Sequence, residues 1–339
     1  MKRTMVWSLV AVGLLLSGFP GFGTELDLVD QVGQSVQVSQ PVERVVSVYG
    51  MGTYYLYALG AQDLLVGGGY VGVKSVAQAS ETLLRMEPRF EDLFFFGDPN
   101  PEEILLRDPD LILADGARHA EFAEQMDDLS VLTLQFLVES SDQLREALRL
   151  TARALGGEAM ARADAFEAEM DRVLEVIGAD LAAVLDEERI QVLFLGTSLE
   201  LVASGDMYQS ELIARAGGRS VSQDLFGYWN EVNLEQIIRW DPDVIIIPPY
   251  GPLQPDQLLS NPDWASIQAV ADGRVYRMPR LIAPMDTPVP ESLLGIVWLA
   301  GTLYPELVSL GLNEEFARFY RDFYGLELTE DEILLLSGQ

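Results

Sequence analysis

A twelve-residue pattern occurs twice, first as Glu102-Glu-Ile-Leu-Leu-Arg-Asp-Pro-Asp-Leu-Ile-Leu113 and again, 133 residues later, as Glu235-Gln-Ile-Ile-Arg-Trp-Asp-Pro-Asp-Val-Ile-Ile246. Each copy begins with the pattern of an amphipathic helix, which must end at Asp-Pro because proline cannot continue the hydrogen-bond ladder. An apolar, β-branched run follows, as is typical of a buried parallel strand. The chain therefore contains one unit twice, and we expect two similar lobes that hold a ligand between them.

Strands and helices alternate around both copies. In the first half we expect strands near 44–49, 64–67, 111–114 and 131–134, with a helix over 53–59 that Gly60 ends. In the second half we expect strands near 189–195 and 275–278 and a helix over 209–216. This alternation predicts an α/β fold with two Rossmann-like parallel-sheet lobes.

The segment between the lobes is helical in composition. Residues 140–186 are rich in Ala, Glu, Arg and Leu, which predicts one helix followed by a longer one that bridges the lobes. A stiff helical bridge limits the lobes to modest rocking. We therefore divide the chain into an N-terminal α/β lobe (24–140), a bridging helical segment (141–186) and a C-terminal α/β lobe with terminal helices (187–339).

The first 23 residues read as a signal peptide. Lys2 and Arg3 precede an apolar run that breaks at Pro20, before the roughly 20 apolar residues that a spanning helix needs. The chain has no cysteine, so no disulfide, thiolate metal site or lipid-bearing cysteine is available. We expect an exported periplasmic protein without a lipid anchor.

The composition is strongly acidic, with a formal net charge of −31. This charge argues against nucleic acid and anionic membranes as partners, because both require clustered Lys and Arg. The acidity itself is explained most simply as a solvated, self-repelling surface, and we expect a monomer.

Three motifs suggest chemistry but carry little support. Gly67-Gly-Gly-Tyr-Val-Gly72 matches a dinucleotide-binding pattern, but the residues after it do not resemble the start of a helix, which favours a plain glycine-rich turn. His119 is the only histidine, so a cage of several imidazoles is impossible; a surface position is favoured over a ligand role. A pair of catalytic carboxylates, as in a secreted hydrolase, cannot be located by sequence.

Aromatic and arginine side chains gather where strands end and loops begin, which is where two-lobed α/β proteins bind ligands. Aromatic rings give broad contact and arginine pairs with carboxylates or oxyanions. Packing in the core is an equally good explanation for Tyr54. The candidate ligand-binding residues are Tyr49, Tyr54, Arg118, Tyr228, Trp229, Tyr250 and Arg280.

These features together resemble the periplasmic substrate-binding proteins of ABC importers for iron siderophores, haem and vitamin B12, which have two lobes joined by one long helix. The resemblance extends over nearly all of the chain after residue 23. It is carried by the order of Pro41–Ser47, Ala58–Ala61, the paired Asp-Pro-Asp strands, Ala214–Gly218, Ala269–Tyr276 and Trp298–Pro305.

The resemblance implies a binding protein without catalytic activity or cofactor, which delivers cargo to an ABC permease in the inner membrane. Glu102 and Glu235 match the family's glutamates that dock against permease arginines, although both also suit the first turn of any helix. The implied cargo is an iron chelate, either a siderophore or haem. Cobalamin or molybdate and tungstate are alternatives within the same class, and a carboxylate-dependent hydrolase is a remote one.

Overall fold

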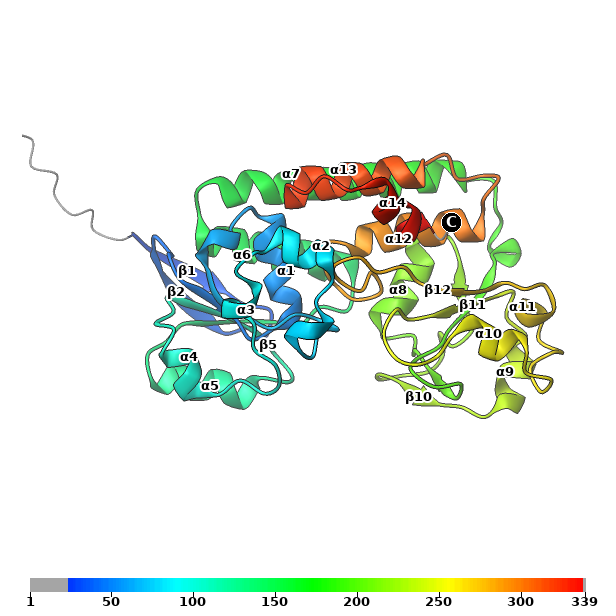
Figure 1. Cartoon of the computed structure of the whole chain (residues 1–339), viewed down its shortest axis with the longest axis horizontal. Coiled ribbons are helices and arrows are strands. Elements are labelled where there is room, and N and C mark those ends of the chain that lie inside the picture. Colours follow the sequence, from blue (N-terminus) through cyan, green and yellow to red (C-terminus); the bar gives the residue numbers. More distant parts are fainter. Residues whose placement is uncertain (1–23, 338–339) are drawn as a thin grey trace, which may run out of the picture.

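The computed structural model describes residues 24–337, so the expected signal peptide lies outside the described residues. Two α/β lobes lie side by side below a long helix, α7 (Glu158–Asp180), which extends across both of them (Figure 1). The predicted α/β class, with two parallel-sheet lobes joined by a long helix, is therefore confirmed. Among residues 24–337, no helix combines the length and the apolar character that crossing a bilayer requires.

The repeated sequence forms the same structure in both lobes. The first copy is helix α4 (Pro101–Leu105) followed by strand β5 (Leu111–Asp115), and the second is α9 (Leu234–Trp240) followed by β11 (Val244–Ile247). Side chains 133 residues apart cap the two helices: Asn100 accepts a hydrogen bond from the backbone of Glu102, and Asn233 accepts one from Gln236.

The first aspartate of each Asp-Pro-Asp lies just beyond its helix in the left-handed conformation, with φ of 47° at Asp108 and 42° at Asp241. Aspartate tolerates this conformation better than most residues, so the chain turns from helix to strand without glycine. The second aspartate ties its strand to a neighbour. Asp110 accepts hydrogen bonds from the backbone of Glu43 and Arg44, both 2.8 Å long, and Asp243 accepts one of 2.7 Å from Gln191.

Asp110→Ala is expected to lower the free energy of unfolding by about 1 to 2 kcal/mol, because two backbone N–H groups lose their charged acceptor. Urea denaturation followed by tryptophan fluorescence measures the loss. Asp110→Asn is the matched control, since one oxygen of Asp110 accepts both bonds and an amide oxygen can replace it. Equal midpoints for Asp110→Ala and the wild type would contradict this role.

Both sheets have four parallel strands in equivalent order. In the first, β4 (Leu65–Gly68), β3 (Val45–Ser47), β5 and β6 (Thr133–Phe136) are adjacent in that order. In the second the order is β9 (Arg219–Ser220), β7 (Gln191–Phe194), β11 and β12 (Val275–Arg277). The strand after Asp-Pro-Asp lies third in both sheets, so the lobes share a topology as well as a motif.

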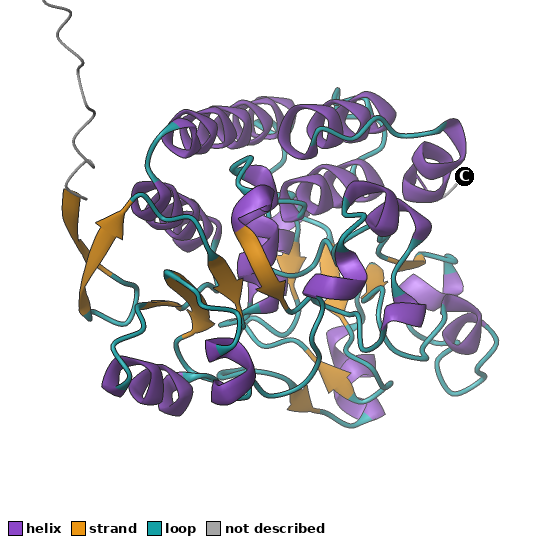
Figure 2. Ribbon diagram, turned by 60° about the vertical axis from the view of Figure 1, so that its left-hand side comes forward, coloured by secondary structure: helices purple, strands orange, loops and turns teal. Residues whose placement is uncertain are grey.

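Helices surround the sheets, as Figure 2 shows. Two small antiparallel pairs complete the strands: β1 (Thr24–Val29) with β2 (Ser35–Gln40), and β8 (Leu201–Val202) with β10 (Asn230–Glu231). The remaining α-helices are α1 (Gly50–Ala58), α2 (Glu81–Met86), α3 (Phe90–Leu93), α5 (Ala120–Asp128), α6 (Ser141–Leu155), α8 (Tyr208–Arg215), α10 (Pro255–Leu259), α11 (Gln268–Ala271), α12 (Ser292–Leu303), α13 (Leu312–Tyr324) and α14 (Glu330–Ser337). Short 3-10 turns occur at Gln62–Leu64, Val76–Gln78 and Asp186–Glu188.

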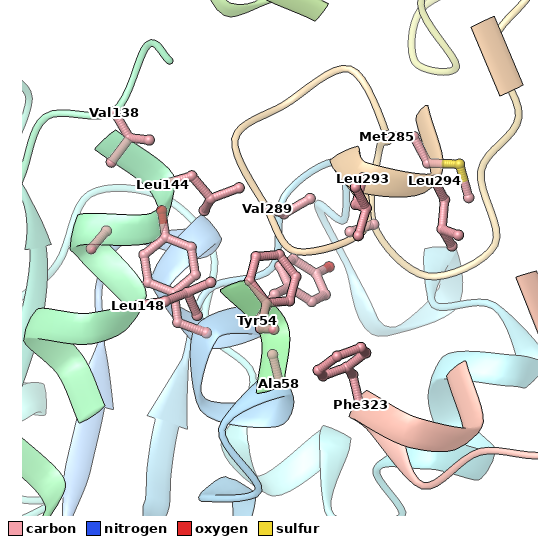
Figure 3. Close-up of a cluster of buried hydrophobic side chains, with 14 of the residues drawn as sticks. Tyr54, Ala58, Val138, Leu144, Leu148, Met285, Val289, Leu293, Leu294 and Phe323 are labelled. Atoms are coloured by element: carbon pink, nitrogen blue, oxygen red, sulfur yellow. The ribbon is translucent and has the colours of Figure 1, made fainter. Parts of the chain in front are cut away.

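One continuous hydrophobic core joins the lobes below α7. It includes strand residues of both sheets and the buried segment 281–290, which leads into α12. Figure 3 shows Val289 and Leu293 of this region beside Tyr54 of the first lobe. Hydrogen bonds also cross between the lobes, from the Tyr55 hydroxyl to Pro288 O (3.1 Å) and from Ser80 Oγ to Leu281 O (2.9 Å). Close packing of this kind limits the lobes to small relative movements.

The glycine-rich motif does not open a helix. Strand β4 ends at Gly68, and residues 69–75 form a turn before the short 3-10 segment at Val76. This agrees with the expectation of a plain turn. The turn nevertheless matters for function, because it forms one wall of the pocket described next.

Candidate functional site

A pocket of about 330 Å³ lies at the carboxyl ends of the first lobe's central strands. Residues 48–51 after β3, 69–74 after β4, 95–97 after α3 and 115–119 at the end of β5 and beyond supply its lining. Parallel sheets bind ligands at this edge, because the loops after the strands converge there. The main chain of the glycine-rich turn lines one side, and Tyr49, Met51 and Phe96 add apolar surface.

Two cationic side chains and a histidine line this pocket. Lys74 and His119 both line it, and they are the only lysine after Lys2 and the only histidine of the chain. Arg118 lies beside them. Within residues 24–337 Lys74 makes no ion pair, and Arg118 pairs only with the exposed Asp98, at 3.2 Å. Such exposed pairs are weak, so both cations remain available to an anionic ligand.

His119 is fixed by its own loop. The Asp115 backbone N–H donates to His119 Nδ1 at 3.1 Å, and the His119 N–H donates to Asp115 O at 3.0 Å. The Asp115 carboxylate in turn accepts from the backbone N–H groups of Ala117 (2.9 Å) and Arg118 (2.7 Å). Burial lowers the pKa of His119. The residue is only 7% exposed, so the favoured surface position was wrong, and His119 forms part of the pocket wall.

Tyr49 lines the same pocket from the second position after β3. Its ring is stacked on Phe136 at a centroid distance of 6.1 Å, and its hydroxyl donates to Met51 Sδ at 3.1 Å. Burial raises its pKa well above the usual value for tyrosine. Tyr49 is therefore a neutral phenol at physiological pH and offers no anionic oxygen to a ligand.

Arg280 reaches this pocket from the second half of the chain. Its guanidinium donates to Gly72 O at 3.0 Å and to Val71 O at 3.3 Å, both in the glycine-rich turn. A third bond, to Ile282 O at 3.3 Å, holds it on its own segment. Main-chain carbonyls therefore accept from three of the five N–H donors of Arg280, and these bonds join the pocket wall to the segment around Arg280.

The other predicted ligand residues lie elsewhere. Tyr228 is 62% exposed in the second lobe, and Trp229 is half-buried against Gly196. Tyr250 follows β11, and its hydroxyl donates to Asp286 Oδ2 at 2.7 Å. Tyr54 is completely buried in α1 within the core and does not line the pocket. The structure thus places Tyr49 and Arg118 in this pocket and Arg280 against its wall, and it places Tyr228, Trp229, Tyr250 and Tyr54 outside the pocket lining.

Two buried carboxylates near Tyr250 and α12 escaped the sequence analysis. Asp286 and Glu291 are both 0% exposed. Burial raises the pKa of Asp286 to about 6 and that of Glu291 to about 7. Asp286 accepts from the Tyr250 hydroxyl, and Glu291 accepts from the Tyr324 hydroxyl. Lys74 was also missed, although its rarity in the sequence was a usable signal.

A larger depression of about 580 Å³ lies along α8 in the second lobe. It mixes Arg189 and Arg219 with Asp186, Glu211 and Glu139, so its charges compensate one another. Part of its lining precedes β7 and β9, at the amino ends of the strands rather than at the ligand-binding edge. Nowhere in residues 24–337 do three or more acidic, histidine or cysteine side chains gather to hold a metal ion. We therefore consider the first-lobe pocket the candidate site.

Comparison with known proteins gives one family match. The model of a family described as periplasmic binding protein matches residues 45–281, more than half of the chain. This range contains both copies of the repeated unit and every residue of the candidate pocket.

Characterised relatives bind different cargo. The chain is 24% identical over 326 residues to the molybdate-binding protein MolA of Haemophilus influenzae, covering 88% of this chain and 91% of MolA. It is 30% identical over 184 residues to the Fe(3+)-citrate-binding protein YfmC of Bacillus subtilis, covering 53% of this chain and 56% of YfmC. A periplasmic solute-binding protein of Veillonella parvula has the same fold, with a TM-score of 0.79, 23% identity and coverage of 92% and 97%.

Proposed function

Since the chain belongs to the periplasmic binding protein family, the substrate-binding components of ABC transporters, we propose that it captures a small oxygen-rich anion in the first-lobe pocket and delivers it to an ABC permease. The family consists of binding proteins, not enzymes, which leaves no support for the hydrolase alternative. The observation that carries the proposal is the convergence of Lys74, Arg118 and His119 in one pocket of a chain with net charge −31.

Electrostatics supports an anionic cargo. The protein as a whole repels anions, so a local group of cations and N–H donors is needed to hold one. Lys74 is the only lysine after the expected signal peptide, and His119 is the only histidine. Chance is therefore a poor explanation for their presence in the same pocket. The pocket lies at the sheet edge where binding sites of this architecture form.

Pocket size favours a small cargo. At about 330 Å³ the pocket is near the lower end of the range for small-molecule sites, which is less suitable for haem or cobalamin. A tetrahedral oxyanion such as molybdate fits the donors and is the cargo named for MolA, a relative that aligns over 88% of this chain. An anionic iron(III) chelate is the second candidate, because exposed aromatic rings at Phe96 in the pocket and at Phe226 and Tyr228 in the second lobe suit a wider ligand.

Calorimetric titration of the protein, unfolded and refolded to remove bound cargo, tests the proposal. Molybdate, tungstate, sulfate, citrate, ferric citrate and haemin are compared in the same buffer. We expect saturable binding either of molybdate and tungstate or of ferric citrate. In the second case we expect no binding of citrate alone. Binding of haemin with no response to any small anion would contradict an anionic cargo.

Lys74→Ala and Arg118→Ala are each expected to weaken binding of the anion about tenfold or more, because a charge-assisted hydrogen bond is lost. Arg153→Ala is the matched control, since Arg153 is exposed on α6 and outside the pocket. Titration with molybdate and ferric citrate measures the affinities. Unchanged affinity in both pocket variants would remove these side chains from the site.

We also propose roles for the second lobe, for the surface that meets the permease and for the N-terminal segment. Tyr228, Trp229 and Tyr250 are proposed to contact cargo from the second lobe, where they follow or adjoin its strands. Glu102 and Glu235 are proposed to dock on the permease. The protein is proposed to act as a periplasmic monomer that residues 1–23 direct to export.

A further inference from the structure

We infer that His119 is a fixed Nε2–H donor, so that the pocket recognises cargo through the cargo's oxygen atoms and not through coordination of a metal by the imidazole. This inference rests on the proposed function for the nature of the cargo. The state of the ring itself can be measured without any cargo.

The contacts of the ring determine where its hydrogen lies. The backbone N–H of Asp115 points at Nδ1 from 3.1 Å. A ring nitrogen that accepts a hydrogen bond carries no hydrogen, so the neutral imidazole must carry its hydrogen on Nε2. Within residues 24–337 no hydrogen bond reaches Nε2, and it remains the ring nitrogen available to a ligand in the pocket.

The surrounding loop holds this arrangement. The Asp115 carboxylate accepts from two backbone N–H groups, at Ala117 and Arg118, and the Asp115 carbonyl accepts from His119 N. Residues 115–119 therefore form a closed turn in which the Asp115 N–H cannot turn away from the ring without losing several bonds. Burial also lowers the pKa of His119, which favours the neutral ring.

Metal coordination would need the opposite arrangement. A histidine that binds a metal almost always donates its second ring N–H to a carboxylate or carbonyl oxygen, which orients the ring and makes it a better ligand. Here the second nitrogen faces a donor, so a hydrogen on Nδ1 would point at the hydrogen of Asp115 N. The imidazole is therefore oriented as a hydrogen-bond donor, and the side chains of the neighbouring Lys74 and Arg118 are donors as well.

Because His119 is the only histidine, tag-free ¹⁵N-labelled protein gives a single imidazole signal set, and long-range ¹H–¹⁵N correlation identifies its tautomer directly. Spectra are recorded for the free protein, with molybdate, and with gallium citrate as a diamagnetic substitute for ferric citrate. We expect Nδ1 without hydrogen and Nε2 with hydrogen in every spectrum. A hydrogen on Nδ1 in the free protein, or loss of the Nε2 hydrogen when cargo binds, would overturn the inference.

Two variants add an independent test. The amide of His119→Gln reaches toward the position of Nε2 and can still donate, whereas His119→Asn reaches only as far as Nδ1. We expect His119→Gln to retain most of the affinity and His119→Asn to lose about tenfold or more. Equal losses would overturn donation through Nε2. If the wild type binds no small anion at all, the proposed function fails, while the tautomer of the free protein still decides the state of His119.

Discussion

Uptake of cargo is expected to fall to background when Glu102 and Glu235 are both replaced by arginine, while the affinity of the protein for cargo stays unchanged. Both glutamates are exposed in the first turns of α4 and α9, and neither makes an ion pair within residues 24–337. Figure 1 places both helices at the side of the lobes opposite α7. A partner that contacts this side meets one carboxylate from each lobe in the same structural setting, since the two helices are copies.

The expected loss is large because charge reversal replaces an attraction with a repulsion at both contact points. Uptake in reconstituted vesicles containing the cognate permease measures it, and calorimetry measures cargo binding separately. The first-turn position costs each variant less than about 1 kcal/mol of stability through the helix dipole, so folding should survive.

The control is the double variant Glu175→Arg, Glu187→Arg, which makes the same charge change at exposed positions on α7 and just beyond it. We expect the control to transport normally. Equal transport by the docking variant and the control would contradict docking through Glu102 and Glu235. Loss of cargo binding in the docking variant would instead indicate damage to the fold.

The duplicated architecture was readable from sequence because its signals are local. Asn100 and Asn233 cap equivalent helices, and each Asp-Pro-Asp ends a helix and begins a buried strand. Proline stereochemistry and apolar runs act over a few residues, so they need no knowledge of distant contacts. The expected strands and helices around them match the observed elements within a few residues. The division of the chain at residues 140 and 186 stays a prediction.

The site was harder to predict because burial depends on distant packing. Tyr54 and Tyr55 are consecutive on α1, and both are completely buried, since the helix lies between the sheet and the C-terminal helices. Periodicity alone cannot distinguish such a helix from one that faces a ligand. Asp286 looks like a loop residue in sequence, yet Gln209 and Tyr250 enclose it. His119 was assigned to the surface for the same reason: the loop that buries it is specified by hydrogen bonds, not by hydrophobic pattern.

Stability is expected to fall as pH rises from about 4 to about 8, because Asp286 and Glu291 must ionise inside the core. The pKa of Asp286 is raised from 3.8 to about 6, and that of Glu291 from 4.5 to about 7, mainly by burial. Below the unfolded-state pKa both states hold the proton and these groups contribute nothing. Above it the unfolded chain releases the proton first, so the folded state loses relative stability until its own pKa is passed.

Each shift corresponds to about 3 kcal/mol at pH 8. Asp286→Asn and Glu291→Gln remove the ionisation and keep an oxygen that can accept from Tyr250 and Tyr324. Relative to the wild type, each variant should therefore gain about 3 kcal/mol between pH 4 and pH 8. Urea denaturation at a series of pH values, followed by tryptophan fluorescence, measures this gain.

Glu332→Gln is the control, since its carboxylate has the opposite shift. Hydrogen bonds from Arg85, the Thr329 backbone and Thr82 lower the pKa of Glu332 to about 2 despite the opposing effect of burial. A lowered pKa adds stability that is complete above the unfolded-state value and is lost only as pH falls toward 2. Glu332→Gln should therefore cost the same at every pH from 5 to 8. Parallel stability curves for the wild type and the two core variants from pH 4 to pH 8 would contradict the prediction. They would show that Asp286 and Glu291 ionise without loss of stability, and that the core around segment 281–290 admits water.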